Sequence, residues 1–199
     1  MSNEMRLYAS ACALSYDDPR ERYETIKKYD LLKGYIIVDE YNGSDYVLII
    51  NKAGFKIYAI RGTHFKMSLK GARDIFEDIN ITFDKKFSLR TMRLSSILKT
   101  IISVYGSNRL VLTGHSLGSK IASSLSNEFE LPAVVFNTGS SLLEGMQVYK
   151  NVVLYTTNDL RSFGIDLLSI SSVLKDEYKK VIIVDKKDNV DRHSILNFL

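Results

Sequence analysis

The segment that most constrains this chain is a five-residue turn, residues 114–118 (Gly-His-Ser-Leu-Gly), because of the sequence on either side of it. An apolar run over residues 109–113 precedes the turn and is typical of a buried strand. Apolar residues then recur every four positions over 116–129, which predicts a helix. A strand, this glycine–x–serine–x–glycine turn and a helix together predict a sharp elbow that exposes the hydroxyl of Ser116 above the sheet.

The rest of the chain predicts an α/β fold built on one mixed sheet. Turn-forming pairs at 42–43 and 53–54 separate three short apolar segments, which favours an antiparallel meander near the N-terminus. Apolar runs then alternate with helical patterns, which favours parallel strands covered on both faces. We expect a single domain over residues 1–199. Its helices are expected at 4–15, 19–32, 88–105, 116–129 and 165–174, with a helical turn at 193–199, and its strands at 35–40, 46–51, 55–61, 109–113, 133–137, 152–157 and 181–184.

Composition excludes several classes of partner and cofactor. The net charge of +4 comes from 27 basic and 23 acidic residues with no dense basic block, which argues against a nucleic-acid partner. The single cysteine, Cys12, cannot form an internal disulfide, and no cluster has metal-ligand spacing. The apolar patch at 7–14 is too short and too polar for a signal peptide or a membrane span. We therefore expect a cytoplasmic protein without metal or cofactor.

A nucleophilic serine needs a base to take its proton and a carboxylate to orient that base. His193, in a polar loop after the last predicted strand, is the favoured base, since α/β hydrolases place the base there. His64 remains an alternative, whereas His115 is expected to pack beside the elbow. For the acid, a carboxylate at a strand end between the serine and the base is required. Asp159 is favoured, with Asp185 second and Asp166 third.

Several segments resemble the class-three lipases, the fungal triacylglycerol-lipase family of the α/β-hydrolase superfamily. Residues 112–118 resemble that family's elbow, and residues 57–63 resemble its strand ending in Arg-Gly-Ser/Thr. Residues 74–79 resemble the acidic-aromatic helix that follows, and the pair 158–159 resembles its Asn/Gly-Asp. The resemblance runs from about residue 5 to the C-terminus in the family's order.

The resemblance implies an α/β-hydrolase fold, with Ser116, Asp159 and His193 as catalytic triad and the amides of Thr63 and Leu117 as oxyanion hole. The geometry expected of Thr63 agrees, because its loop leaves a strand beside the elbow. Two departures stand out. The family's second glycine after the elbow is replaced by Ser119-Lys120, and residues 160–163 lack the prolines that often follow the acid.

These residues predict a serine ester hydrolase that acts on an acyl ester, most plausibly a lipid. Residues 64–73 occupy the place of the family's lid and alternate apolar side chains with lysines. Such a segment is read either as a plain surface loop or as a shortened lid that makes transient contact with an anionic membrane surface. Two alternatives remain: a non-catalytic binding module with the same fold, and an acyltransferase that uses the same triad.

Overall fold

The computed structural model describes residues 2–62, 72–138, 147–157, 177–185, 187–188, 190 and 194–199, and over residues 72–88 it describes the backbone only. Within these ranges seven strands form one sheet, in which each strand neighbours the next in the sequence. The first three pair antiparallel, and all later pairs are parallel. The predicted α/β fold with an N-terminal meander is therefore confirmed. The strands are Tyr35–Gly43 (β1), Tyr46–Asn51 (β2), Lys56–Ile60 (β3), Leu110–His115 (β4), Ala133–Phe136 (β5), Val148–Thr157 (β6) and Glu177–Val184 (β7).

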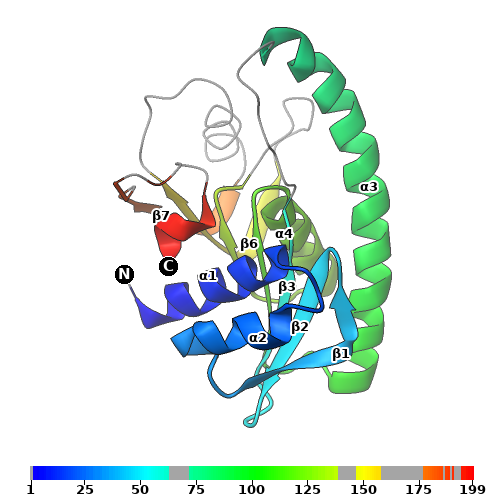
Figure 1. The fold of residues 1–199 in the computed structure, drawn as a ribbon. Helices are drawn as coiled ribbons and strands as arrows, with labels where there is room; N and C mark the ends of the chain where they lie inside the picture. Colours follow the sequence, from blue (N-terminus) through cyan, green and yellow to red (C-terminus); the bar gives the residue numbers. More distant parts are fainter. Residues whose placement is uncertain are drawn as a thin grey trace.

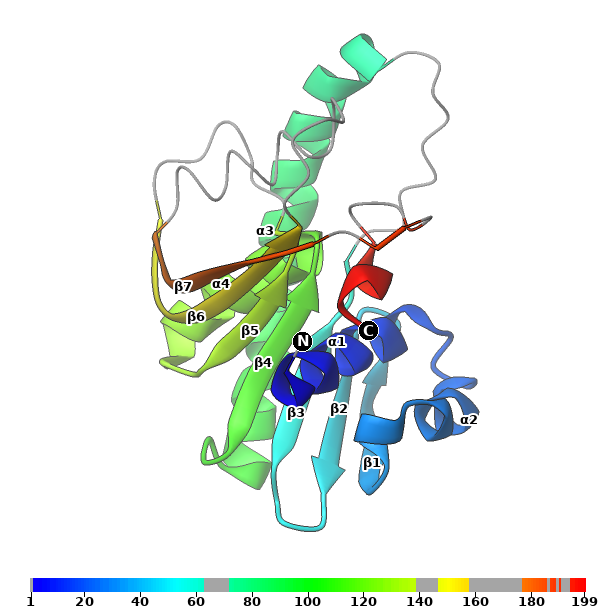
Figure 2. The ribbon, with the colours of Figure 1, turned by 90° about the vertical axis from the view of Figure 1, so that its left-hand side faces the viewer.

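Helices cover both faces of the sheet (Figure 2). Helix α1 (Asn3–Tyr16) and the 3-10 turn η3 (Ile195–Phe198) pack side by side on one face. Helices α3 (Ala72–Tyr105) and α4 (Leu117–Phe129) pack on the other. Successive residues of β3 alternate between these two cores, as the pleat of a strand requires. The sheet is thus buried on both sides at its centre, which explains why its central strands are continuously apolar.

The predicted helix over 19–32 is wrong in part. The chain there forms a short helix α2 (Arg22–Thr25) and two 3-10 turns, η1 (Ile26–Lys28) and η2 (Asp30–Leu32). Ile26 and Leu32 both reach the core, yet they lie six residues apart. On a straight helix that spacing would place them on different faces, so the backbone breaks at Tyr29, which is extended with φ −94° and ψ 105°.

Helix α3 is longer than predicted and begins at Ala72 rather than at residue 88. No glycine or proline interrupts residues 72–105, so nothing in the backbone ends the helix earlier. At 34 residues the helix is about 51 Å long. Its N-terminal half extends past the carboxyl ends of the parallel strands (Figure 1). Gly106, with φ 72°, directly follows its last residue. Among the described helices, none is both long and apolar enough to cross a bilayer.

Strands β1, β6 and β7 also extend beyond their predicted bounds. Strands β6 and β7 gain residues whose side chains face solvent, since Lys150 in β6 and Glu177 and Lys179 in β7 are exposed, whereas the residues that β1 gains, 41–43, are half-buried. Hydrophobic runs mark only buried positions, so the polar ends of strands near the edge of a sheet escape that signal. The predicted short helix at 165–174 lies outside the described residues.

Candidate active site

Ser116 joins β4 to α4 in a backbone conformation that an ordinary helix start does not use. Its φ of 58° and ψ of −125° lie outside the allowed regions for a non-glycine residue. The chain provides two ordinary serine caps for comparison. Ser2 and Ser194 are extended, and each accepts a hydrogen bond from a helix amide through its hydroxyl. Ser116 makes no such bond. Its strained geometry therefore does not serve to cap α4.

Glycines allow the elbow (residues 114–118) to form. A Cβ built on Gly114 would lie 2.2 Å from the carbonyl oxygen of Gly118, and one built on Gly118 would lie 2.3 Å from that of Ile60. Both contacts are to backbone atoms, which cannot move aside as a flexible side chain can. The flanking glycines are thus needed where β3, β4 and α4 meet, as the motif predicts.

The peptide groups of Ser116 are held by hydrogen bonds. Its amide donates to the carbonyl of Phe136 over 3.1 Å. Its carbonyl accepts from the amide of Ser119 over 3.1 Å and from the hydroxyl of Ser119 over 2.6 Å. Ser119, where the lipase family commonly has glycine, is fully buried. The departure is therefore accommodated, because the serine hydroxyl bonds to the elbow itself.

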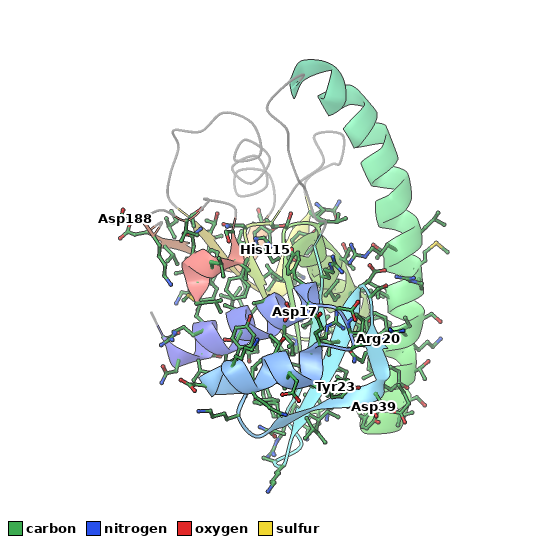
Figure 3. All side chains as sticks on the ribbon, in the orientation of Figure 1. Asp17, Arg20, Tyr23, Asp39, His115 and Asp188 are labelled. Atoms are coloured by element: carbon green, nitrogen blue, oxygen red, sulfur yellow. The ribbon has the colours of Figure 1, made fainter. Side chains whose placement is uncertain are left out.

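The His115 side chain lies on the α1 side of the sheet. Its Nδ1 is 2.8 Å from the hydroxyl oxygen of Tyr16, the last residue of α1, and the two rings meet edge to face. Figure 3 shows His115 at the carboxyl ends of the parallel strands, and Asp17, which follows Tyr16, near the end of α1. His115 is buried. It therefore packs beside the elbow.

The one cysteine also lies under the elbow. The Cys12 thiol donates to the hydroxyl oxygen of Thr113 over 3.1 Å, and the Thr113 hydroxyl donates to the carbonyl of Val134 over 2.7 Å. Complete burial raises the pKa of Cys12 to about 12. The thiol therefore stays protonated at neutral pH and is a poor nucleophile.

The two favoured candidates for the acid, Asp159 and Asp185, follow the ends of β6 and β7 in the sequence. Thr157 of β6 is level with Val184 of β7, and Asp185 follows directly as an exposed residue. Asp159 and Asp166 lie outside the described residues. Since neighbouring strands are about 4.8 Å apart, the end of β6 is about 10 Å from β4 and that of β7 about 14 Å. The end of β6 is therefore nearer the elbow than Asp185.

The remaining predicted site residues, Thr63, His64 and His193, and residues 64–71 of the lid-like segment, lie outside the described residues; residues 72–73 begin α3. Their neighbours are described. A Cβ built on Gly62 would lie 3.2 Å from the Cβ of Ser116, so the end of β3 passes beside the serine. Leu117 is the first residue of α4, and the first amides of a helix lack acceptors within it. Turn η3 packs near the carboxyl end of β5, with ring centroids of Phe198 and Phe136 5.0 Å apart.

Two residues near the elbow were not predicted from sequence. Tyr16 contacts His115 although 99 positions separate them. Asn137, at φ 41°, accepts the Thr157 amide through its side-chain oxygen over 3.1 Å and so ties the ends of β5 and β6 together. No local pattern signals either contact, since both depend on sheet order. In the described ranges, no three His, Cys, Asp or Glu side chains gather as metal ligands.

Comparison with known proteins gives weak structural similarity only. No protein-family model matches the chain, and no curated protein sequence matches it. Among solved structures, the native Rhizomucor miehei lipase–propeptide complex aligns at 14% identity with a TM-score of 0.43, over 77% of this chain and 60% of that chain. Lip2 lipase from Yarrowia lipolytica aligns at 15% identity with a TM-score of 0.46, over 78% and 72%. The chain thus spans less than two thirds of the Rhizomucor protein that it matches.

Proposed function

We propose that this chain is a serine ester hydrolase with Ser116 as its nucleophile. The observation that carries the proposal is the backbone of Ser116, which stays strained without capping the helix that it begins. Strain of this kind costs on the order of 1–3 kcal/mol and persists mainly where function requires it. A nucleophile elbow requires it, because only this turn lifts the serine hydroxyl above the ends of the strands.

The proposed reaction follows the acyl-enzyme route. The Ser116 oxygen attacks the ester carbonyl while His193 takes its proton, and a tetrahedral oxyanion forms. The intermediate collapses, the bond to the alkoxy group breaks, and His193 returns the proton to the departing alcohol. Water then attacks the acyl-enzyme, with His193 as base, and releases the acid and the free serine. Asp159 orients the imidazole throughout.

Strand spacing supports Asp159 over Asp185 as the acid. An imidazole and two hydrogen bonds of about 3 Å each span less than about 10 Å between the serine and the carboxylate. Residue 159 follows the end of β6, two strands from the elbow, whereas Asp185 follows β7, three strands away. The hydrogen bond from Thr157 to Asn137 holds the end of β6 against β5, the strand next to the elbow.

The proposed oxyanion hole uses two amides from different elements. Leu117, at the start of α4, directly follows the nucleophile and supplies the first. Thr63 supplies the second, which the proximity of Gly62 to Ser116 supports. The Leu117 amide comes from the start of α4, which packs against β4, so little reorganisation of this donor is needed as the negative charge develops.

The experiment that tests the proposal is labelling of the purified protein with a fluorophosphonate probe. We expect one covalent adduct, located at Ser116 by peptide mass spectrometry, and hydrolysis of p-nitrophenyl esters. A binding module of the same fold would give neither. Production of a new ester from an added alcohol, in place of the free acid, would instead identify an acyltransferase.

The triad predicts the effects of two substitutions. We expect Asp159→Asn to keep the fold and to lower kcat about 10⁴-fold, because the imidazole loses its orienting acceptor. We expect His193→Ala to lower it at least as much, since the base itself is lost. The measurement is p-nitrophenyl ester turnover together with thermal unfolding, and Asp185→Asn and His64→Ala are the matched controls. A severe loss of kcat in Asp185→Asn with a mild loss in Asp159→Asn would make Asp185 the acid. A severe loss in His64→Ala with a mild loss in His193→Ala would make His64 the base.

The proposed substrate is an acyl ester with a medium or long chain. The support is the sequence that follows Thr63, where Phe65, Met67 and Leu69 alternate with polar residues that include Lys66 and Lys70. Each buried methylene contributes about 0.8 kcal/mol. We therefore expect kcat/KM to rise from acetate to octanoate across a p-nitrophenyl ester series. The highest value at acetate would contradict this choice of substrate.

A further inference from the structure

The hydroxyl of Tyr16 joins the two backbone segments that flank the elbow. Its oxygen is 2.8 Å from Nδ1 of His115, and it also forms a hydrogen bond with the backbone of Gly62. His115 is the last residue of β4, and Gly62 lies two residues after the end of β3. Tyr16 itself ends α1, so a single side chain links three elements at the carboxyl edge of the sheet.

The direction of each hydrogen bond follows from the chemistry of the groups. A peptide N–H only donates, so the Gly62 amide donates to the Tyr16 oxygen. Burial, the largest influence, raises the pKa of Tyr16, so the phenol keeps its proton at neutral pH. We assign that proton to the bond with Nδ1 of His115, which places the imidazole proton on Nε2. The three groups thus form one chain, from the Gly62 amide to the Tyr16 hydroxyl to the His115 ring.

Gly62 has no room to move toward α1 or β4. A Cβ built on it would lie 2.2 Å from the Tyr16 hydroxyl oxygen and 2.4 Å from the carbonyl oxygen of His115. The same Cβ would lie 3.2 Å from that of Ser116. The Tyr16 hydroxyl therefore sets how closely the strand that carries Gly62 approaches the nucleophile.

The end of α1 is itself held firmly. The fully buried Arg22 side chain donates from Nε to the carbonyl of Leu14 over 3.1 Å and from a terminal nitrogen to that of Ser15 over 2.8 Å. Its other terminal nitrogen donates to Asn42, Gly43 and Tyr46 in the β1–β2 hairpin, at 2.7, 2.8 and 3.0 Å. Tyr16 therefore projects from a rigid support, which is the condition for a side chain that positions another group.

We propose that Tyr16 is a positioning residue for the oxyanion hole. It acts through Gly62: its hydrogen bond holds the Arg61–Gly62 peptide group, one residue before the Thr63 amide, which is the second proposed oxyanion donor. Oxyanion donors act in the transition state, so a displaced amide lowers kcat more than it raises KM. This inference rests on the proposed hydrolase function and adds a residue that does not touch substrate.

The test compares Tyr16→Phe with Tyr58→Phe. Both remove one phenolic hydroxyl and keep the ring, but the hydroxyl of Tyr58, in β3, has no hydrogen-bond partner in the described structure. We expect Tyr16→Phe to lower kcat on p-nitrophenyl esters about 10- to 100-fold with KM within about threefold of wild type. Tyr58→Phe is expected to change neither. Thermal unfolding of both variants checks that the fold is kept.

A second readout does not depend on activity. Nitrogen NMR of the histidine rings reports which nitrogen of His115 carries the proton. We expect Nδ1 to be an unprotonated acceptor in wild type and in Tyr58→Phe, and to lose that state in Tyr16→Phe. The Gly62 amide resonance is expected to shift in Tyr16→Phe as well.

The outcomes separate this inference from the proposed function. If wild type neither labels nor hydrolyses esters, the proposed function fails and the catalytic role of Tyr16 with it. If wild type is active but Tyr16→Phe matches Tyr58→Phe within twofold in kcat, only the positioning role is overturned. A loss confined to KM, or an unchanged His115 ring and Gly62 amide, would also overturn it.

Discussion

Ser116→Ala is expected to abolish fluorophosphonate labelling and to lower ester turnover by about six orders of magnitude. Triad residues act as a unit, so removal of the nucleophile leaves only the residual effect of binding and the oxyanion hole. Alanine keeps the Cβ and therefore the strained backbone, so the free energy of unfolding should change by less than about 1 kcal/mol. Probe labelling, p-nitrophenyl ester kinetics and urea unfolding measure the three effects.

Ser123→Ala is the matched control for this variant. Ser123 lies in the same helix, α4, and its hydroxyl donates to the carbonyl of Ser119 over 2.9 Å, away from the reacting atoms. The Ser123→Ala variant should react with the fluorophosphonate probe at the wild-type rate. Labelling of Ser116→Ala at another serine, such as Ser140, would contradict the assignment of the nucleophile.

Gly118→Ala is expected to destabilise the fold by at least about 3 kcal/mol, among the largest effects of a single methyl group. The added Cβ would lie 2.3 Å from the carbonyl oxygen of Ile60 and 2.8 Å from the carbonyl carbon of Arg61. To relieve these close contacts, α4 would have to separate from β3, and that would widen the space between Ser116 and the end of β3. Urea unfolding measures the loss, and probe labelling should fall with it.

Gly54→Ala separates this steric effect from the ordinary cost of replacing a glycine. Gly54 has a φ of 76°, but a Cβ there would meet nothing within 4 Å. Its cost is conformational and should be about 1–2 kcal/mol, with labelling unchanged. Equal losses in both variants would mean that the crowding at Gly118 relaxes readily and that the elbow is less constrained than its backbone indicates.

Local sequence signals predicted the elements that carry the site. The apolar run at 109–113 and the four-residue spacing over 116–129 correspond to β4 and α4, and the glycines between them have the close contacts that the motif implies. The meander was equally predictable, because its turns use residues with a strong turn preference. Such signals depend only on a residue and its near neighbours in the sequence, so they do not depend on how the rest of the chain packs.

Other features had no local signal. The spacing of Ile26 and Leu32 broke a predicted helix. Helix α3 continued through residues 72–87, where only the resemblance of residues 74–79 to a family helix, and no periodic pattern of apolar residues, had indicated a helix. Solvent-facing residues extended β6 and β7 beyond their apolar runs. In each case packing against the rest of the molecule overrode or completed a weak local preference.

The sequence by itself determined the α/β class and the elbow, and it singled out Ser116 as the proposed nucleophile, because a glycine–x–serine–x–glycine turn between a strand and a helix leaves few backbone solutions. Only the tertiary structure decided that Ser116 is strained without capping its helix, that Ser119 bonds to the elbow, and that Tyr16 meets His115 and Gly62. These contacts join residues up to 99 positions apart. They exist because the parallel order of β3 and β4 and the packing of α1 bring three chain segments to one edge of the sheet.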